Sequence, residues 1–372
     1  MAKPVNQRLA DEAVRHRLYL ARLGTGNARK LQAVMKKAEL EISMELFRAL
    51  ERTQPTALTW NQQRLASIKK SLQKTVASVY EQVFGQLNAD LKELVKYEVD
   101  YQAKTLTSAF PLEAQPLVNI QSTTWQQVWA SATAKPFQGS LLKEWADKLP
   151  ANLVNKIGNA VQQGVLLGES YTDIIKRVKG TKAANYADGV VGRSRNSELA
   201  NLVKTAVNHV TAEAREKTAE VNQDIIKARE WLSTLDNHTS PMCIIRDRLL
   251  YTAGSKPKPI GHSVPYGAGP GRLHFCCRST ETWVIKSWEE LGLKLKEMST
   301  GTRASMSGQV PADMSYGKWL ARQDYATQEQ VLGVTRAQML RDGKVSVPDL
   351  FSDKGEWLTL DQLKKIGTIT AS

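Results

Sequence analysis

The sequence predicts a mainly α protein that carries a small α+β module. Two observations indicate this fold class. In the first half, apolar residues recur every three or four positions, which is the spacing of amphipathic helices. A stretch that begins at Trp231 is instead rich in turns and gathers all three cysteines. We therefore expect an extended helical N-terminal region at 1–137, a helical segment at 138–230, a small α+β cassette at 231–290, and short helices and turns at 291–372.

Two long helices are expected in the N-terminal region. One apolar stripe runs from Leu31 to Leu50, and a second, with coiled-coil-like steps of three and four, runs from Leu65 to Leu94. Pro55 lies between the stripes and marks the end of the first helix. We expect the two helices to pack as an antiparallel hairpin. A hairpin of this kind usually forms a core or a surface for a partner.

Shorter helices are expected between the hairpin and the cassette. A loop followed by a short helix is expected between Thr105 and Pro136. Further helices are expected at about 138–165, at 170–179 with Ser170 or Thr172 as its N-terminal cap, and at about 197–231. The last of these would deliver the chain to the cassette, with Trp231 at its end.

Inside the cassette, short apolar runs at 248–252 and 281–285 predict strands. Between Tyr251 and Arg272 the chain contains five glycines and four prolines, which predicts a long loop. A loop of this length is normally functional or is ordered by a partner. We expect its order, and that of the N-terminal helices, to depend on a partner.

The composition is that of a globular protein with an anionic neighbour. The chain has 372 residues, of which 42% are hydrophobic and 24% are charged, so it can form two or three domains with a buried core. Its formal net charge is +14 at pH 7. A cation excess of this size favours nucleic acid or another anionic surface as a partner.

The cysteine content and the N-terminus indicate the compartment. Three cysteines in so long a chain argue against a disulfide scaffold and for a reducing environment. The N-terminus lacks the apolar core of a signal peptide, and no window approaches the length of a membrane span. We expect a protein that is made and used in the cytoplasm, or in a particle assembled there, with no membrane partner.

The cassette also carries a recognisable order of residues. Trp231 is followed by Asp236, then by the turn Thr239-Ser-Pro-Met-Cys243, and, after the Gly- and Pro-rich loop, by His274-Phe-Cys-Cys-Arg278. This order resembles the phage minor head proteins, the Mu F-like head-morphogenesis family. In that family a helix ends in Trp, an Asp and a Thr-x-Pro-x-Cys turn follow, and the segment closes with His-Pro-Asn-Cys-Arg-Cys. Here Ser240 and Ser279 stand where many members have cysteines, so two thiolate ligands of the family pattern are missing.

The resemblance covers roughly residues 150 to 365. It includes 158–176, the helix with Thr205 and Asn208, and the tail segments 311–320 and 332–336. It implies a structural minor capsid protein of a tailed phage, bound at or near the portal inside the head, which assists head assembly and DNA packaging or ejection. The implied partners are the portal protein, the major capsid or scaffolding protein, and packaged double-stranded DNA. The implied location is the interior of the virion head, after assembly in the host cytoplasm.

The resemblance implies binding and not catalysis, but two other functions remain open. One is a metal-dependent enzyme that uses the cassette, and the other is a stand-alone basic DNA-binding protein. Zinc prefers tetrahedral sulfur and nitrogen ligands. The candidates for such ligands are Cys243, His274, Cys276 and Cys277, with His238, His262 or Asp236 as a fourth.

Against a metal site, the cassette has no Cys-x-x-Cys pair, and the distance in sequence between Cys243 and His274 specifies no geometry. The sequence favours a hydrogen-bonded histidine and small buried thiols that close a turn, without a cofactor. A nucleophilic pair of Cys277 and His274 is disfavoured too, because catalytic partners usually come from distant segments. No catalytic residue is therefore predicted.

The remaining candidates are structural or bind nucleic acid. Asp236 and Arg278 are expected to form an ion pair that holds the two halves of the cassette together. The residues expected to shape the cassette are Trp231, Asp236, Cys243, His274, Cys277 and Arg278. A cluster of cations with a single acid, Asp188, is the candidate for phosphate contacts, with a solvated helix face as the alternative. It consists of Lys176, Arg177, Lys179, Lys182, Arg193 and Arg195.

Overall fold

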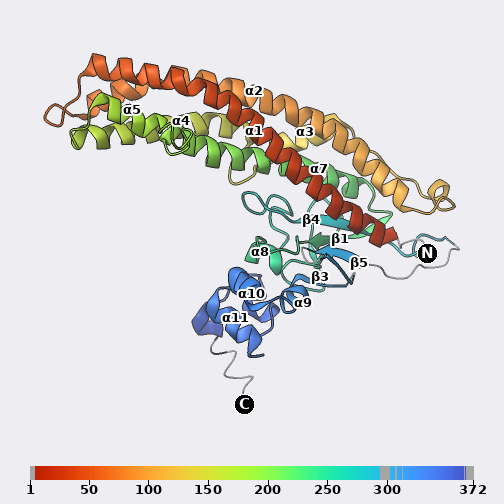
Figure 1. Cartoon of the computed structure of the whole chain (residues 1–372). Helices are drawn as coiled ribbons and strands as arrows, with labels where there is room; N and C mark the ends of the chain where they lie inside the picture. The colour runs from red at the N-terminus through yellow and green to blue at the C-terminus, as the bar shows by residue number, and fades with distance from the viewer. Residues whose placement is uncertain (1–4, 294–301, 306–307, 312, 364, 366–372) are drawn as a thin grey trace. The chain divides into compact units, whose positions relative to one another are not determined.

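The computed structural model describes residues 5–293, 302–305, 308–311, 313–363 and 365 (Figure 1). It confirms the predicted class, a mainly helical protein with one small antiparallel sheet and a separate two-stranded hairpin. The chain forms two compact units. Unit 1 comprises 1–21, 95–130 and 208–372, and unit 2 comprises 22–94 and 131–207. These units divide the chain differently from the four expected regions, because long helices run from one unit into the other.

Two long helices form the expected hairpin. They are α1 (Val5–Thr53) and α2 (Gln62–Ala109). Their antiparallel pairing is seen within each unit. In unit 1 the hydroxyl of Tyr101 donates to Glu12 at 2.6 Å, and in unit 2 Lys30 Nζ donates to Asp90 at 2.9 Å. The first helix begins much earlier than Leu31, because small apolar residues such as Ala13 continue its buried stripe.

In the part of the chain that the structure describes, the regular elements of unit 2 are helices, joined by loops. Besides parts of α1 and α2, it contains the helices α4 (Leu142–Leu166), α5 (Tyr171–Lys179) and α6 (Val190–Arg193), the π-helix η2 (Ser194–Leu199) and the start of α7 (Ala200–Val221). Ser170, one of the two predicted caps, accepts a hydrogen bond from the backbone N–H of Asp173. A Cβ on Gly158 would meet the side chain of Lys69, so α4 and α2 approach closely at this glycine.

The sheet of unit 1 has the strand order β3-β2-β1-β4, and all neighbours are antiparallel. Its strands are β1 (Ile226–Leu232), β2 (Leu250–Tyr251), β3 (Pro259–Ile260) and β4 (Thr280–Ile285). Arg229 of β1 faces Tyr251 on one side and Trp283 on the other. The predicted strands at 248–252 and 281–285 are confirmed. The glycine-rich segment between them, expected to be a long loop, contains the short strand β3.

The expected helix at 197–231 is wrong in its last third. Helix α7 ends at Val221, and the chain then forms strand β1. Trp231 therefore lies on a strand and not at the end of a helix. The side-chain amide of Asn222 donates to the carbonyl of Thr218 and helps to end the helix. Residues 226–232 include good helix formers, but pairing with strands on both sides overrides this local preference.

Short elements complete unit 1, and the short helices among them were predicted, whereas the hairpin of β5 and β6 was not. The loop and helix expected between 105 and 136 are the 3₁₀ turn η1 (Gln115–Leu117) and α3 (Trp125–Ala134), whose last residues belong to unit 2. The C-terminal elements are the hairpin β5 (Thr302–Ser305) and β6 (Gly308–Pro311), then α9 (Tyr316–Leu320), α10 (Tyr325–Leu332), α11 (Val334–Arg341) and η3 (Pro348–Leu350). None of the described helices combines the length and apolar character needed to cross a bilayer.

Candidate functional site

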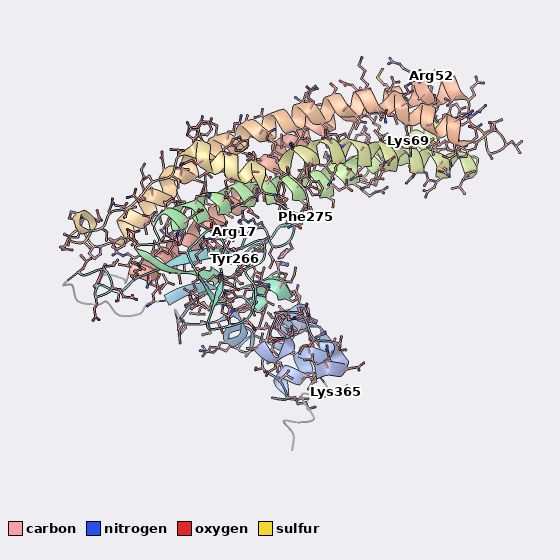
Figure 2. All side chains as sticks on the ribbon, turned by 180° about the vertical axis from the view of Figure 1, so that it is seen from behind. Arg17, Arg52, Lys69, Tyr266, Phe275 and Lys365 are labelled. Carbon is pink, nitrogen blue, oxygen red and sulfur yellow. The ribbon has the colours of Figure 1, made fainter. Side chains whose placement is uncertain are left out.

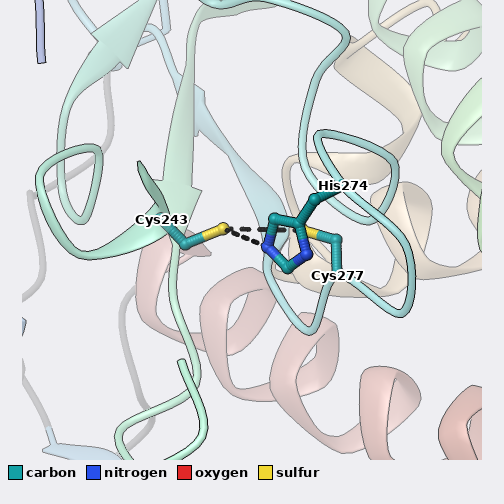
Figure 3. A group of neighbouring side chains, drawn as sticks. All are labelled: Cys243, His274 and Cys277. Atoms are coloured by element: carbon teal, nitrogen blue, oxygen red, sulfur yellow. Dashed lines mark hydrogen bonds between the residues drawn. The ribbon is translucent and has the colours of Figure 1, made fainter. Parts of the chain in front are cut away.

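Two turns of unit 1 bring sulfur and imidazole groups together. The first is α8 (Pro241–Ile244), a single helical turn with proline at its first position, and it carries Cys243. The second is the turn from His274 to Cys277, in which the backbone N–H of Cys277 donates to the carbonyl of His274 at 3.1 Å. Cys276 adopts a φ of 55° there, a left-handed conformation that tightens the turn. Figure 3 shows Cys243 facing His274 and Cys277.

The three side chains form a compact cluster. Cys243 Sγ lies 3.6 Å from Cys277 Sγ and 3.4 Å from His274 Nε2. The potential ligand atoms of all three residues lie within 4.8 Å of one another. Both cysteines are buried, whereas His274 is partly exposed. All three residues are candidate ligands predicted from the sequence, and the structure places them together.

The other candidate ligands lie apart from this cluster. His262 Nε2 bonds to the carbonyl of Leu250 at 2.9 Å, and Asp236 pairs with Arg278. Cys276 and His238 also lie outside the cluster in the described part of the chain. The expectation that one of His238, His262 or Asp236 supplies a fourth ligand is therefore not met. The side chain of Ser240 lies beside the cluster instead, with its hydroxyl 2.8 Å from His274 Nε2.

Hydrogen bonds determine the protonation within the cluster. His274 Nδ1 lies 2.9 Å from the carbonyl of Phe275, which can only accept, so Nδ1 carries the proton. In the neutral ring, Nε2 then points a lone pair toward Cys243. A hydrogen bond from the Cys243 thiol lowers the pKa of Cys277, and the same contact, together with burial, raises the pKa of Cys243. The hydrogen bond with Cys277 raises the pKa of His274, and burial opposes this rise.

An arginine from the start of the chain holds the second turn. Arg17, labelled in Figure 2, reaches it from α1. Its Nη2 donates to the carbonyl of Cys277 at 2.8 Å, and its Nε donates to the carbonyl of Arg278 at 3.1 Å. Its Nη1 donates to the side chain of Asn208 at 2.9 Å. Burial lowers the pKa of Arg17 to about 10, while the nearby Cys277 opposes this shift. The sequence gives no sign of this contact, since 260 positions separate Arg17 from Cys277.

The expected ion pair between Asp236 and Arg278 is confirmed. Arg278 Nη2 lies 2.5 Å from Asp236 Oδ2, with the arginine side chain 41% exposed and the aspartate 9% exposed. The hydroxyl of Thr234 also donates to the carbonyl of Arg278 at 2.9 Å. Trp231 is buried in the same apolar cluster as Cys243 and Cys277. The residues expected to shape the cassette thus lie in one module.

A buried charge network lies beside this cluster, and sequence reasoning missed it. Arg272 bonds to Glu213 at 3.1 Å and to Glu216 at 2.5 Å. The hydroxyl of Tyr266 donates to Glu281 at 2.6 Å. Burial raises the pKa of Glu281, and the neighbouring Glu216 adds to this rise. Glutamates three residues apart on α7 were a possible signal, but no local pattern reveals their partners on the loop and on β1.

In unit 2, one member of the predicted phosphate-binding cluster faces inward. Arg195 is 5% exposed, and its guanidinium pairs with the buried carboxylate of Glu39. The prediction that it contacts phosphate is therefore wrong. The reason is its position on η2, whose buried face meets α1 at Glu39, whereas the sequence suggested a solvated run of cations.

The other cations of this cluster are at least partly exposed. Lys176 pairs with Asp173 at 3.0 Å, and Arg177 pairs with Glu169. Lys179 Nζ lies 5.0 Å from the ring centroid of Tyr186. Arg193, which donates to the carbonyl of Asp188, and Lys182 are exposed. Neighbouring acids thus neutralise part of the positive surface that the sequence suggests.

No protein-family model, curated protein or solved structure matches this chain. Its function must therefore be inferred from the residues and their geometry. The cassette offers two kinds of chemistry: the ligand set of a metal ion, and a set of contacts that fixes distant chain segments in one rigid module.

Proposed function

We propose that this protein is a structural minor capsid protein of the phage head-morphogenesis type. It binds at or near the portal inside the head and assists head assembly and DNA packaging or ejection. Its partners in this proposal are the portal protein, the major capsid or scaffolding protein, and packaged double-stranded DNA. Its activity is binding without turnover.

The observation that supports this proposal is that the cassette and the tail, the segments that resemble the family, contact one another. Asp236 and Arg278 come from the two ends of the cassette and form an ion pair. The tail joins them through Tyr316, whose hydroxyl donates to the carbonyl of Asp236 at 2.6 Å and whose backbone N–H donates to Asp247 at 2.7 Å. These contacts support the proposal, because they join the segments that resemble the family within one module.

The part of helix α1 that belongs to unit 2 carries a surface for binding the portal protein. Leu40, Met44 and Phe47 are 57%, 47% and 40% exposed, although all three are large and apolar. Their spacing of four and three places them on one face of the helix. An exposed apolar stripe on a helix is typical of a protein-binding surface. We assign the portal contact to this stripe.

The net charge supports a position close to packaged DNA. With a net charge of +14, the chain can lie close to the dense phosphates of packaged DNA. Exposed cations such as Lys182 and Arg193 can contact the DNA backbone without reading the base sequence. Such contacts weaken steeply as salt rises. The apolar stripe is expected to respond much less to salt, so the two kinds of binding can be separated.

The test is co-purification of the full chain with the portal protein of its own phage, at low and at moderate salt, followed by mass determination. The expected result is a salt-resistant complex that Leu40→Asp combined with Met44→Asp abolishes. Leu58→Asp is the matched control, because Leu58 is 99% exposed in the turn between the two long helices and lies outside the stripe. Absence of a complex, together with salt-sensitive DNA binding, would replace this proposal with a stand-alone DNA-binding protein.

A further inference from the structure

We infer that Cys243, His274 and Cys277 form a zinc-binding site whose fourth position lies beside Ser240. This inference is independent of the capsid proposal. It differs from the prediction made from the sequence, which favoured a hydrogen-bonded histidine and buried thiols without metal.

The spacing of the ligand atoms is the first argument. Zinc binds cysteine sulfur at about 2.3 Å and histidine nitrogen at about 2.0 Å, so a tetrahedral ion separates two sulfurs by about 3.8 Å and sulfur from nitrogen by about 3.5 Å. The measured separations are 3.6 Å between the two sulfurs and 3.4 Å between Cys243 Sγ and His274 Nε2. A disulfide would need sulfurs about 2.05 Å apart. The pair is thus spaced for a shared ion.

The orientation of the imidazole is the second argument. Metal-binding histidines usually donate their other ring N–H to a carbonyl or carboxylate, which fixes the tautomer and aims the free nitrogen at the metal. His274 has this arrangement, with Nδ1 donating to the carbonyl of Phe275 at 2.9 Å and Nε2 facing Cys243. Nε2 is thus the ring nitrogen left to bind a metal, and it lies beside Cys243 Sγ and the Ser240 hydroxyl.

The charge balance is the third argument. Two buried thiolates are unstable without a compensating positive charge. A divalent ion supplies that charge and forms a neutral centre with them.

The position of the cluster indicates a structural role. Bound zinc would link α8 to the turn before β4, which are the two halves of the cassette. With three protein ligands, the fourth position falls to the hydroxyl of Ser240 or to water entering on the exposed side of His274. Asp236, a nearby carboxylate in the sequence, is held by Arg278 and does not join the ligand set.

The test uses the full chain, purified under reducing conditions with zinc and then freed of unbound metal. We expect about one zinc per chain, and we expect cobalt to give the intense visible and thiolate charge-transfer bands of a tetrahedral sulfur site. Cys243→Ser and Cys277→Ser should each abolish both signals, and His274→Gln should weaken binding at least about tenfold. Cys276→Ser is the matched control, since it removes a neighbouring thiol outside the cluster.

Two results would overturn the inference. The first is a folded wild-type chain that binds neither zinc nor cobalt while both thiols remain titratable. The second is loss of zinc from Cys276→Ser to the same extent as from Cys277→Ser. Circular dichroism of each variant shows that a missing signal is not simply a missing fold. Neither result depends on whether the chain binds a portal.

Discussion

Arg17 Nη2 lies 2.8 Å from the carbonyl oxygen of Cys277, although the two residues are 260 positions apart. The contact joins the first helix to the cassette within unit 1. It places a positive charge on the backbone of the turn that carries two members of the sulfur and imidazole cluster. The first prediction follows from this contact.

Arg17→Ala is expected to lower the free energy of unfolding by about 2–3 kcal/mol, because it leaves carbonyl groups of Cys277 and Arg278 without their charged donor. The measurement is the denaturant midpoint of the full chain. Arg15→Ala is the control, since Arg15 lies on the same helix with its side chain 77% exposed and forms a surface pair with Glu12. Equal effects of the two variants would show that Arg17 does not hold the turn.

The ion pair of the cassette should contribute more modestly. Asp236→Asn is expected to cost about 1 kcal/mol, because Arg278 is partly exposed and water screens the lost attraction. Thermal unfolding of the variant measures this loss. Asp173→Asn, which removes an exposed pair with Lys176, serves for comparison and should change stability less. A cost near zero at Asp236 would mean that the two halves of the cassette are held by other contacts.

The buried network predicts a specific dependence on pH. Burial raises the pKa of Glu281 above its ordinary value of 4.5. At a pH between the ordinary and the raised pKa, the native state therefore holds a proton that the unfolded chain has lost. Stability contributed by this group is therefore present below the ordinary value and is lost as pH rises through the raised one. The free energy of unfolding of the wild type minus that of Glu281→Gln should fall across this window and stay level outside it.

An exposed glutamate provides the control of opposite sign. A hydrogen bond from Lys227 lowers the pKa of Glu290, so its contribution is present above the ordinary value and is lost as pH falls. The difference between wild type and Glu290→Gln should thus rise with pH, if it changes measurably at all. If the difference in the free energy of unfolding between wild type and Glu281→Gln also rises with pH, the carboxyl of Glu281 is charged in the native state throughout the pH range.

The sequence predicted those features that depend on local patterns. The apolar spacing from Leu31 to Leu94 predicted the antiparallel hairpin, because a helix places residues three and four apart on one face whatever surrounds it. The charge and position of Asp236 and Arg278 likewise predicted their pairing, which the structure confirms. In both cases the signal lies in the residues themselves.

Other contacts between distant segments could not be predicted from the sequence. Strand β1 looked like the end of a helix, because its strand state depends on pairing with β2 and β4 and not on its own residues. Arg195 looked solvated, because nothing near it in sequence reveals the buried Glu39. The thiol and imidazole cluster was named residue by residue, but its spacing emerged only once α8 met the turn at His274.

The last prediction concerns the open position of the inferred zinc site. Ser240→Cys places a thiol where the hydroxyl now lies 2.8 Å from His274 Nε2, so it offers zinc a third sulfur and completes a four-ligand site. We expect zinc affinity to rise at least about tenfold, since a thiolate replaces a weak oxygen ligand or water. Competition with a chromogenic chelator measures the affinity. Ser255→Cys, which adds an exposed thiol in the loop after β2, should leave it unchanged. If both variants tighten binding equally, the added thiols act through the surface, and the fourth position does not lie beside Ser240.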